Sequence, residues 1–263
     1  MIKKKMKKSI KNLLVIPVIL LVLTNAISAL PEPIITIADS IQAERDEILS
    51  LAALAIVYKD WQISKDGRGY NIGAILANEQ GEPVFWARNS VGILDNATQH
   101  AEVRLIQNYL DCPCVGKYAD KYTVYTTLEP CAMCSGLLAL AKVKRVVYLQ
   151  RDPGFGNAHE ALKAIKYPRV YEQSTPLKNK QKLLLEHGFQ SYMAEKKDSN
   201  ITNYLFSEEA RKIFASSIGA IENFKLIYQE NQKVLSKVQS LISGEMPETY
   251  GADMIEKKCP KKK

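Results

Sequence analysis

The sequence predicts a layered α/β fold with helices on both faces of one sheet. Between about residues 41 and 166, segments with helical apolar spacing alternate with shorter runs rich in Val, Ile, Tyr and Thr. This order is typical of α/β domains, in which helices cover a central sheet. The 263 residues, of which 46% are hydrophobic, suffice for one such domain and an extension.

The predicted elements begin with a helix over residues 41–61, with Asp39 or Ser40 as its N-cap. Strands over 70–77 and 83–88 flank Asn78-Glu79-Gln80-Gly81 and should form a hairpin. The rest of the domain is expected to consist of helices over 100–110, 131–142 and 158–166 and strands over 122–128 and 145–150.

Beyond about residue 167 the prediction depends on apolar spacing alone. Residues 183–192 fit a helix end and a short strand, and a long amphipathic helix should run from Ser207 to near Gly244. Its stripe either packs against the α/β domain or contacts a second copy of the chain. The stripe consists of Phe214, Ile218, Ile221, Tyr228, Leu235, Val238 and Ile242. We therefore expect a domain over 39–167 and a helical C-terminal extension over 168–263.

Residues 1–29 have the form of a secretory signal peptide. Six Lys residues precede an apolar run over 13–23, and small residues follow up to Ala29. The run is about half as long as a membrane span and contains Pro17, which favours a cleaved signal over a retained anchor. We expect cleavage after Ser28 or Ala29 and export to the periplasm or the medium.

The positive charge of the chain lies mostly at its ends. The net charge is +8, but residues 1–29 contribute six Lys and no acid, so the remainder has 30 basic and 28 acidic residues. Five more Lys surround Cys259 in the last seven residues and fit a solvated tail. A mature chain near +2 gives little support for nucleic-acid binding, which uses several Lys or Arg contacts to phosphates.

Three metal-binding side chains occur at a spacing that suits zinc. His100 precedes Cys131 and Cys134, which two residues separate. Zinc takes four ligands in a tetrahedron, so three protein ligands leave one position for water, as in catalytic sites. Cys131 and Cys134 share a face of a helix that begins near Pro130, and its positive end favours thiolates. Glu102 should lie in an irregular first turn, where its carboxylate reaches the water.

The segments His100-Ala101-Glu102 and Thr127-Leu128-Glu129-Pro130-Cys131-Ala132-Met133-Cys134 together resemble the cytidine deaminase superfamily of zinc enzymes. The resemblance covers about residues 45–165 and looks most like the tRNA adenosine deaminase and guanine deaminase branch. The riboflavin-pathway deaminases fit less well, because a longer spacer separates their two Cys ligands. The resemblance implies a three-layer α/β/α fold with a mixed sheet of about five strands.

The same resemblance assigns roles to individual residues. It implies zinc held by His100, Cys131 and Cys134, with Glu102 as the catalytic proton carrier. Asn89, eleven residues before His100, matches a substrate-contacting Asn of that branch. Related free-base deaminases place substrate-binding acids after the fourth strand, where this chain has Asp152; an Asp beside Pro and Gly fits an ordinary turn equally well.

We therefore expect a hydrolytic deaminase of a nucleobase or nucleoside, in which zinc-bound hydroxide attacks the amino-bearing carbon and Glu102 protonates the leaving ammonia. One alternative is a secreted deaminase of RNA or DNA, acting as a toxin. Another is a non-catalytic zinc module in which Glu102 or Cys114 is the fourth ligand. Cys112, Cys114 and Cys259 allow at most one disulfide among them, and a second copy of the chain remains a candidate partner.

Overall fold

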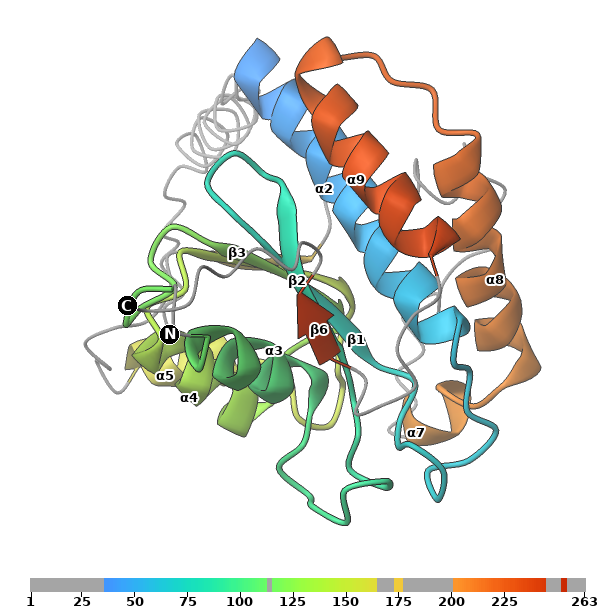
Figure 1. The fold of residues 1–263 in the computed structure, drawn as a ribbon. Helices are drawn as coiled ribbons and strands as arrows, with labels where there is room; N and C mark the ends of the chain where they lie inside the picture. The colour runs from blue at the N-terminus through green and yellow to red at the C-terminus, as the bar shows by residue number, and fades with distance from the viewer. Residues whose placement is uncertain (1–35, 113–114, 165–172, 177–200, 245–251, 255–263) are drawn as a thin grey trace, which may run out of the picture. The chain divides into compact units, whose positions relative to one another are not determined.

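One mixed sheet organises the part of the chain that the structure describes. The computed structural model describes residues 36–112, 115–164, 173–176, 201–244 and 252–254. Its strands lie in the order β5-β4-β3-β1-β2-β6 (Figure 1). Their bounds are β1 (Gly73–Ala77), β2 (Pro83–Arg88), β3 (Thr123–Leu128), β4 (Arg145–Gln150), β5 (Gln173–Pro176) and β6 (Ala252–Met254).

The pairing within this sheet is both parallel and antiparallel. β3, β4 and β5 run parallel to one another, whereas β1 pairs antiparallel with β2 and with β3, and β6 pairs antiparallel with β2. The predicted α/β class with a mixed sheet is therefore confirmed. The described strands number six, where about five were expected.

The first two strands form the predicted hairpin. The Asn78 Oδ1 atom accepts hydrogen bonds from the backbone N–H groups of Gln80 (3.1 Å) and Glu82 (2.9 Å), and Gly81 has a φ of 78°. An Asn that bonds its own turn and a Gly in the left-handed region together reverse a chain. The hairpin makes β1 a central strand, with β2 on one side and β3 on the other.

Helix α2 (Ile37–Tyr58) lies between the sheet and the C-terminal helices α8 (Glu208–Glu222) and α9 (Gln232–Ser243) (Figure 1). Every residue from 48 to 57 is buried, and a helix that is apolar all round needs cover on several sides. One core cluster joins these residues to Ile75 and Val147 of the sheet and to Phe214 and Leu235 of the C-terminal helices. The predicted packing on the sheet accounts for only one side of α2.

The opposite face of the sheet carries the helices that lead to the candidate site. They are α3 (Ala101–Leu110), α4 (Ala132–Leu140) and α5 (Ala158–Ala164) (Figure 1). A second core cluster joins Leu105 of α3 and Leu138 of α4 to Leu76, Val124 and Val146 of the strands. Helices therefore cover both faces, which gives the expected three layers with α8 and α9 added outside α2.

The C-terminal extension corrects the prediction of one long helix. After the short α7 (Ile201–Tyr204), the chain forms α8 and α9, separated by residues 223–231, which end in a 3-10 helix η1 (Gln229–Asn231). The buried Glu44 carboxylate of α2 accepts hydrogen bonds from the Ile227 N–H (2.6 Å) and from Asn231 Nδ2 (2.8 Å). These bonds fix a reversal that brings both apolar stripes onto α2, which one straight helix would not allow.

The extension also differs from a separate appendage. Residues 38–263 form one compact unit, in which β5 and β6 extend the sheet. Phe214, Ile221 and Val238 lie in the core cluster of α2. Of the two alternatives for the apolar stripe, the structure therefore has packing against the α/β domain.

Several predictions concern residues outside the described ranges. They are the signal peptide over 1–29, the elements expected over 183–192, Cys114, and the Lys-rich end with Cys259. Within the described part of the chain, no helix is both long enough and apolar enough to span a membrane.

Candidate active site

The three predicted metal ligands lie at the first residues of two neighbouring helices. His100 is the N-cap of α3, Cys131 is the N-cap of α4, and Cys134 follows within the first turn of α4. N-caps are usually Ser, Thr, Asp or Asn, whose oxygens bond to the first backbone N–H groups. Neither the His100 nor the Cys131 side chain makes such a bond. Both side chains are therefore available to a metal ion.

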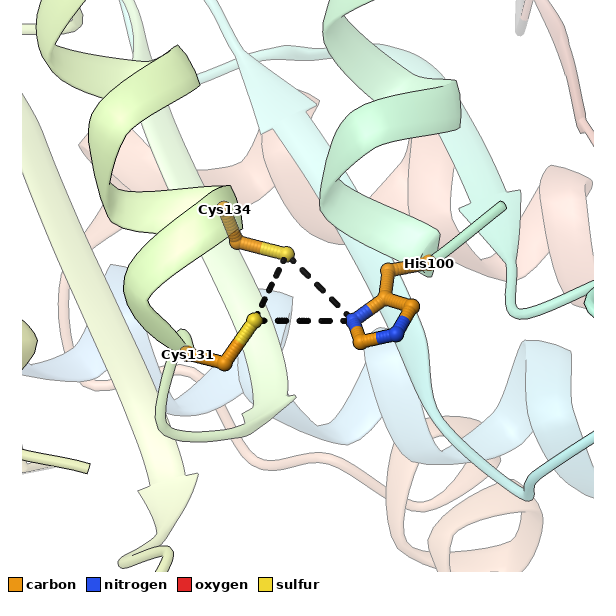
Figure 2. A group of neighbouring side chains, drawn as sticks. All are labelled: His100, Cys131 and Cys134. Carbon is orange, nitrogen blue, oxygen red and sulfur yellow. Dashed lines mark hydrogen bonds between the residues drawn. The ribbon is translucent and has the colours of Figure 1, made fainter. Parts of the chain in front are cut away.

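The three ligand atoms match one face of a zinc tetrahedron (Figure 2). The His100 Nδ1 atom lies 3.7 Å from Cys131 Sγ and 3.6 Å from Cys134 Sγ, and the two sulfur atoms are 3.7 Å apart. With ordinary Zn–S and Zn–N bond lengths, a tetrahedron has edges of about 3.8 Å between sulfurs and about 3.6 Å between sulfur and nitrogen. Among the described residues, no fourth protein ligand joins this group. The donor set therefore fits zinc with one position left for another ligand.

The two sulfur atoms have different protonation behaviour. The pKa of Cys131 is lowered to about 4, because its contacts with the Cys134 sulfur (3.7 Å) and with the His100 ring favour the thiolate. The pKa of Cys134 is raised, because its contact with Cys131, its burial and the nearby Glu102 carboxylate all disfavour a negative charge on its sulfur. Thiolates are the species that bind zinc, so the lowered pKa of Cys131 favours the form that zinc requires.

Glu102 lies next to the metal ligands and is almost fully buried, with 3% of its surface exposed. The Thr126 hydroxyl donates to its Oε1 atom (3.2 Å), and the Cys134 thiol contacts Oε2 (3.5 Å). Burial raises the pKa of Glu102. The backbone of His100 is extended, and the residues after it are helical. The His100 and Glu102 side chains therefore both face the candidate metal position, as the predicted irregular first turn implied.

The pairing register brings Asn89 to the same end of the sheet. Gly73 pairs with Arg88, and its N–H donates to the Thr127 hydroxyl (3.1 Å), so the end of β2 lies level with the end of β3. The Ser90 N–H bonds to the Gln99 carbonyl (2.9 Å), which brings Asn89 near His100. Sites in α/β folds form beyond such strand ends.

The Asn89 side chain has one satisfied and one unsatisfied end. Its Oδ1 atom accepts hydrogen bonds from the backbone N–H groups of Tyr70 (3.1 Å) and Val91 (3.3 Å). Its Nδ2 atom is buried and has no hydrogen-bond partner among the described residues. Leaving a buried donor unpaired costs about 1–3 kcal/mol. The arrangement suits a group that donates to a substrate.

Asp152 is used differently. Its Oδ1 atom accepts hydrogen bonds from the N–H groups of Gly154 (2.9 Å) and Phe155 (3.0 Å). These bonds form an ordinary turn, which the Asp-Pro-Gly sequence predicted as the alternative to a substrate contact. Its role in substrate binding stays a prediction, with one of its two carboxylate oxygens committed to the turn.

Glu129 holds a loop beside the candidate site, a role that the sequence analysis did not assign to it. Its Oε1 accepts from the Asn157 N–H (2.9 Å) and its Oε2 from the Asp152 N–H (3.2 Å). The buried carboxylate therefore fixes the loop over 152–157. Glu129 itself lies two residues before the zinc ligand Cys131. Its place in the motif was the available signal, since a Glu in an otherwise apolar stretch needs a polar partner when buried.

A pocket of about 320 Å³ lies at the opposite end of the sheet, where Thr123 and Arg145 begin β3 and β4. It contains none of the predicted site residues. The chemistry that the residues support therefore belongs to the buried group around His100 and not to this pocket.

Comparison with known proteins agrees with the geometry. The family model described as the cytidine and deoxycytidylate deaminase zinc-binding region matches residues 46–150. A tRNA-specific adenosine deaminase of Aquifex aeolicus is 34% identical over 120 residues, which are 44% of this chain and 78% of that protein. The chain belongs to this deaminase family. The family match and the placement of His100, Cys131 and Cys134 confirm the zinc prediction. The prediction of a hydrolytic C–N deaminase is confirmed at the level of the family.

Further relatives and solved structures match other extents of the chain. The tRNA-specific adenosine deaminase 2 of Xenopus laevis is 41% identical over 80 residues, which are 28% of this chain and 46% of that relative. A solved structure from work on tRNA:A34 deaminases is 25% identical, with a TM-score of 0.35, and covers 40% of this chain and 75% of that one. Guanine deaminase from Bacillus subtilis is 25% identical with a TM-score of 0.30, over 49% of this chain and 84% of its own.

Proposed function

We propose that the chain is an exported, zinc-dependent deaminase that removes an amino group from a nucleobase or nucleoside as ammonia. The observation that carries this proposal is the buried Glu102 carboxylate beside a three-ligand zinc group. A structural zinc site uses four protein ligands, whereas a catalytic one keeps a position open. A buried acid beside that position is what a proton-transfer reaction requires.

The roles of the side chains follow from their contacts. Zinc, when bound by His100, Cys131 and Cys134, supplies a Lewis acid that lowers the pKa of the attacking water. Glu102 accepts the proton of that water at a carboxylate oxygen and returns it to the departing amine. The Thr126 hydroxyl holds Oε1 and thereby the direction of the carboxylate. Asn89 donates from Nδ2 to an acceptor atom of the ring.

A substrate panel tests the proposal directly. Ammonia release should be measured with guanine, adenosine, cytosine and cytidine, using zinc-loaded protein. Turnover of a small neutral substrate should change little between about 50 and 200 mM salt, because no phosphate contacts are involved. Inactivity on the whole panel would remove the small-molecule proposal.

A second candidate is deamination of RNA or DNA. It is supported by the names of the relatives, several of which are tRNA-specific adenosine deaminases. Polynucleotide binding releases counterions, so activity on single-stranded RNA should fall steeply over the same salt range. Salt-sensitive deamination of RNA or DNA without turnover of any base or nucleoside would favour this candidate.

The proposal of export depends on residues 1–29 and has its own test. The Lys-rich start, the short apolar run and the small residues up to Ala29 support removal of this segment during secretion. Protein from the natural host should begin near Ala29 or Leu30 by N-terminal sequencing. Recovery of intact Met1 from the cytoplasm would contradict it.

A further inference from the structure

Arg68 is a buried cation that the proposed reaction does not use. Only 5% of its surface is exposed, although burying a charge costs several kcal/mol unless partners compensate. Its Nε atom pairs with Asp60 Oδ2 (2.6 Å), and its Nη2 atom donates to the Asp60 carbonyl (3.2 Å). Its Nη1 atom donates to the backbone carbonyl of Asn89. The guanidinium therefore joins the end of α2 to the residue that carries the unsatisfied amide.

The backbone around Arg68 holds the same turn from other directions. The Arg68 carbonyl accepts hydrogen bonds from the N–H groups of Gly92 (3.1 Å) and Ile93 (3.3 Å). Two residues later, the Tyr70 N–H donates to Asn89 Oδ1. Between them, Gly69 has a φ of 137°, and a Cβ there would lie 2.3 Å from Asn89 Oδ1. The 68–70 segment thus occupies both the main-chain oxygen and the side-chain oxygen of Asn89.

These contacts determine which atom Asn89 can offer. An amide can present either its oxygen or its nitrogen when it is free to turn, and a satisfied Oδ1 removes that choice. Nδ2 remains as the unpaired polar atom of this side chain among the described residues. A small displacement of the Asn89 peptide would move Nδ2, and misplacement by about 1 Å can cost about 100-fold in rate.

We propose that Arg68 is a positioning residue, which fixes the peptide of Asn89 so that Nδ2 is presented as a donor to a ring acceptor of the substrate. This inference rests on the proposed function, because it assigns the donor to that reaction. It also restricts the substrates to bases that offer an acceptor at the matching place. Lys at position 68 would keep the charge but not the fork that reaches Asp60 and Asn89 together.

A double-mutant cycle tests the coupling between the two residues. In full-length, zinc-loaded protein, Arg68→Lys should lower kcat/KM about 10- to 100-fold. In an Asn89→Ala background, the same change should lower it less than about two-fold, because its target is gone. Losses that multiply in the double variant would overturn the proposal and leave Arg68 a structural residue. Zinc content and Tm of each variant identify any that fail to fold.

A second readout does not depend on turnover. The Asn89 side-chain amide pair can be identified in a ¹⁵N spectrum by its absence from Asn89→Ala. We expect Arg68→Lys to shift this pair and to raise its hydrogen-exchange rate at least about ten-fold. An unchanged pair would overturn the inference. A wild-type protein without turnover on any substrate would refute the proposed function and leave this measurement valid.

Discussion

Replacing Glu44 with Ala should destabilise the protein strongly, although Glu44 lies far in the sequence from the helices that it holds. Its carboxylate accepts hydrogen bonds from the N–H groups of Ile227 (2.6 Å) and Tyr228 (3.3 Å) and from Asn231 Nδ2 (2.8 Å). Hydrogen bonds to a charged group contribute about 1.5–3 kcal/mol each, and the 3.3 Å contact is the weakest.

The expected loss follows from what each donor can do afterwards. Ile227 is 71% exposed, so water can replace the carboxylate at its N–H. Asn231 is fully buried, and one of its N–H groups would be left unpaired. Together these effects predict a loss of about 3 kcal/mol in the free energy of unfolding, which is a large share of the usual 5–15 kcal/mol.

Chemical denaturation measures this loss as a lower midpoint with an unchanged slope. Glu230→Ala is the matched control, because Glu230 is exposed in the same segment and should change stability by less than about 0.5 kcal/mol. A Glu44→Ala loss as small as that of the control would refute the idea that this carboxylate fixes the α8–α9 reversal.

Three further predictions concern the turns and the surface. Gly69→Ala should cost about 1–3 kcal/mol of stability and reduce turnover, because the φ of Gly69 is positive and the added Cβ would meet Asn89 Oδ1; an unaltered Tm with full activity would contradict this. Asp152→Asn should keep kcat/KM within about two-fold if the turn is its role, since Oδ1 is retained; a loss above about ten-fold would favour a substrate contact. Glu82 bonds Lys233 (2.6 Å) and Lys237 (2.9 Å), which lowers its pKa, so its stabilisation is present above about pH 4.5 and is lost as the pH falls through the lowered pKa. Denaturation should therefore show Glu82→Gln about 1 kcal/mol less stable at pH 7 and equal to wild type in acid; a gap that persists in acid would contradict the ion pair.

Local patterns in the sequence predicted the parts of the fold that depend on neighbouring residues. The strands over 83–88 and 145–150 have the predicted bounds, because runs of β-formers there are bounded by turn and charged residues. The short spacing of Cys131 and Cys134 already brings them to one helix end, and His100 reaches them because its own helix starts at the same end of the sheet.

Long-range contacts account for what the sequence did not predict. The apolar spacing over 214–242 predicted one helix. The segment that divides it is bonded to the carboxylate of Glu44 on α2, a contact between residues far apart in the sequence. Residues 48–57 of α2 are buried on every side because α8 and α9, from the end of the chain, cover the side that faces away from the sheet. The contact of Arg68 with the Asn89 carbonyl is a side chain bonded to main chain, which residue types and spacing do not reveal.

The most direct test of the account compares zinc content with turnover in Glu102→Gln. This substitution keeps the size of the side chain and leaves the three ligands His100, Cys131 and Cys134 intact. We predict about one zinc per chain, as in wild type, and a kcat lower by about 10²- to 10⁴-fold on whichever substrate the wild-type protein deaminates. Cys131→Ser should instead lose most of the zinc and the activity together. Wild-type turnover by zinc-loaded Glu102→Gln would contradict the claim that this carboxylate moves the proton.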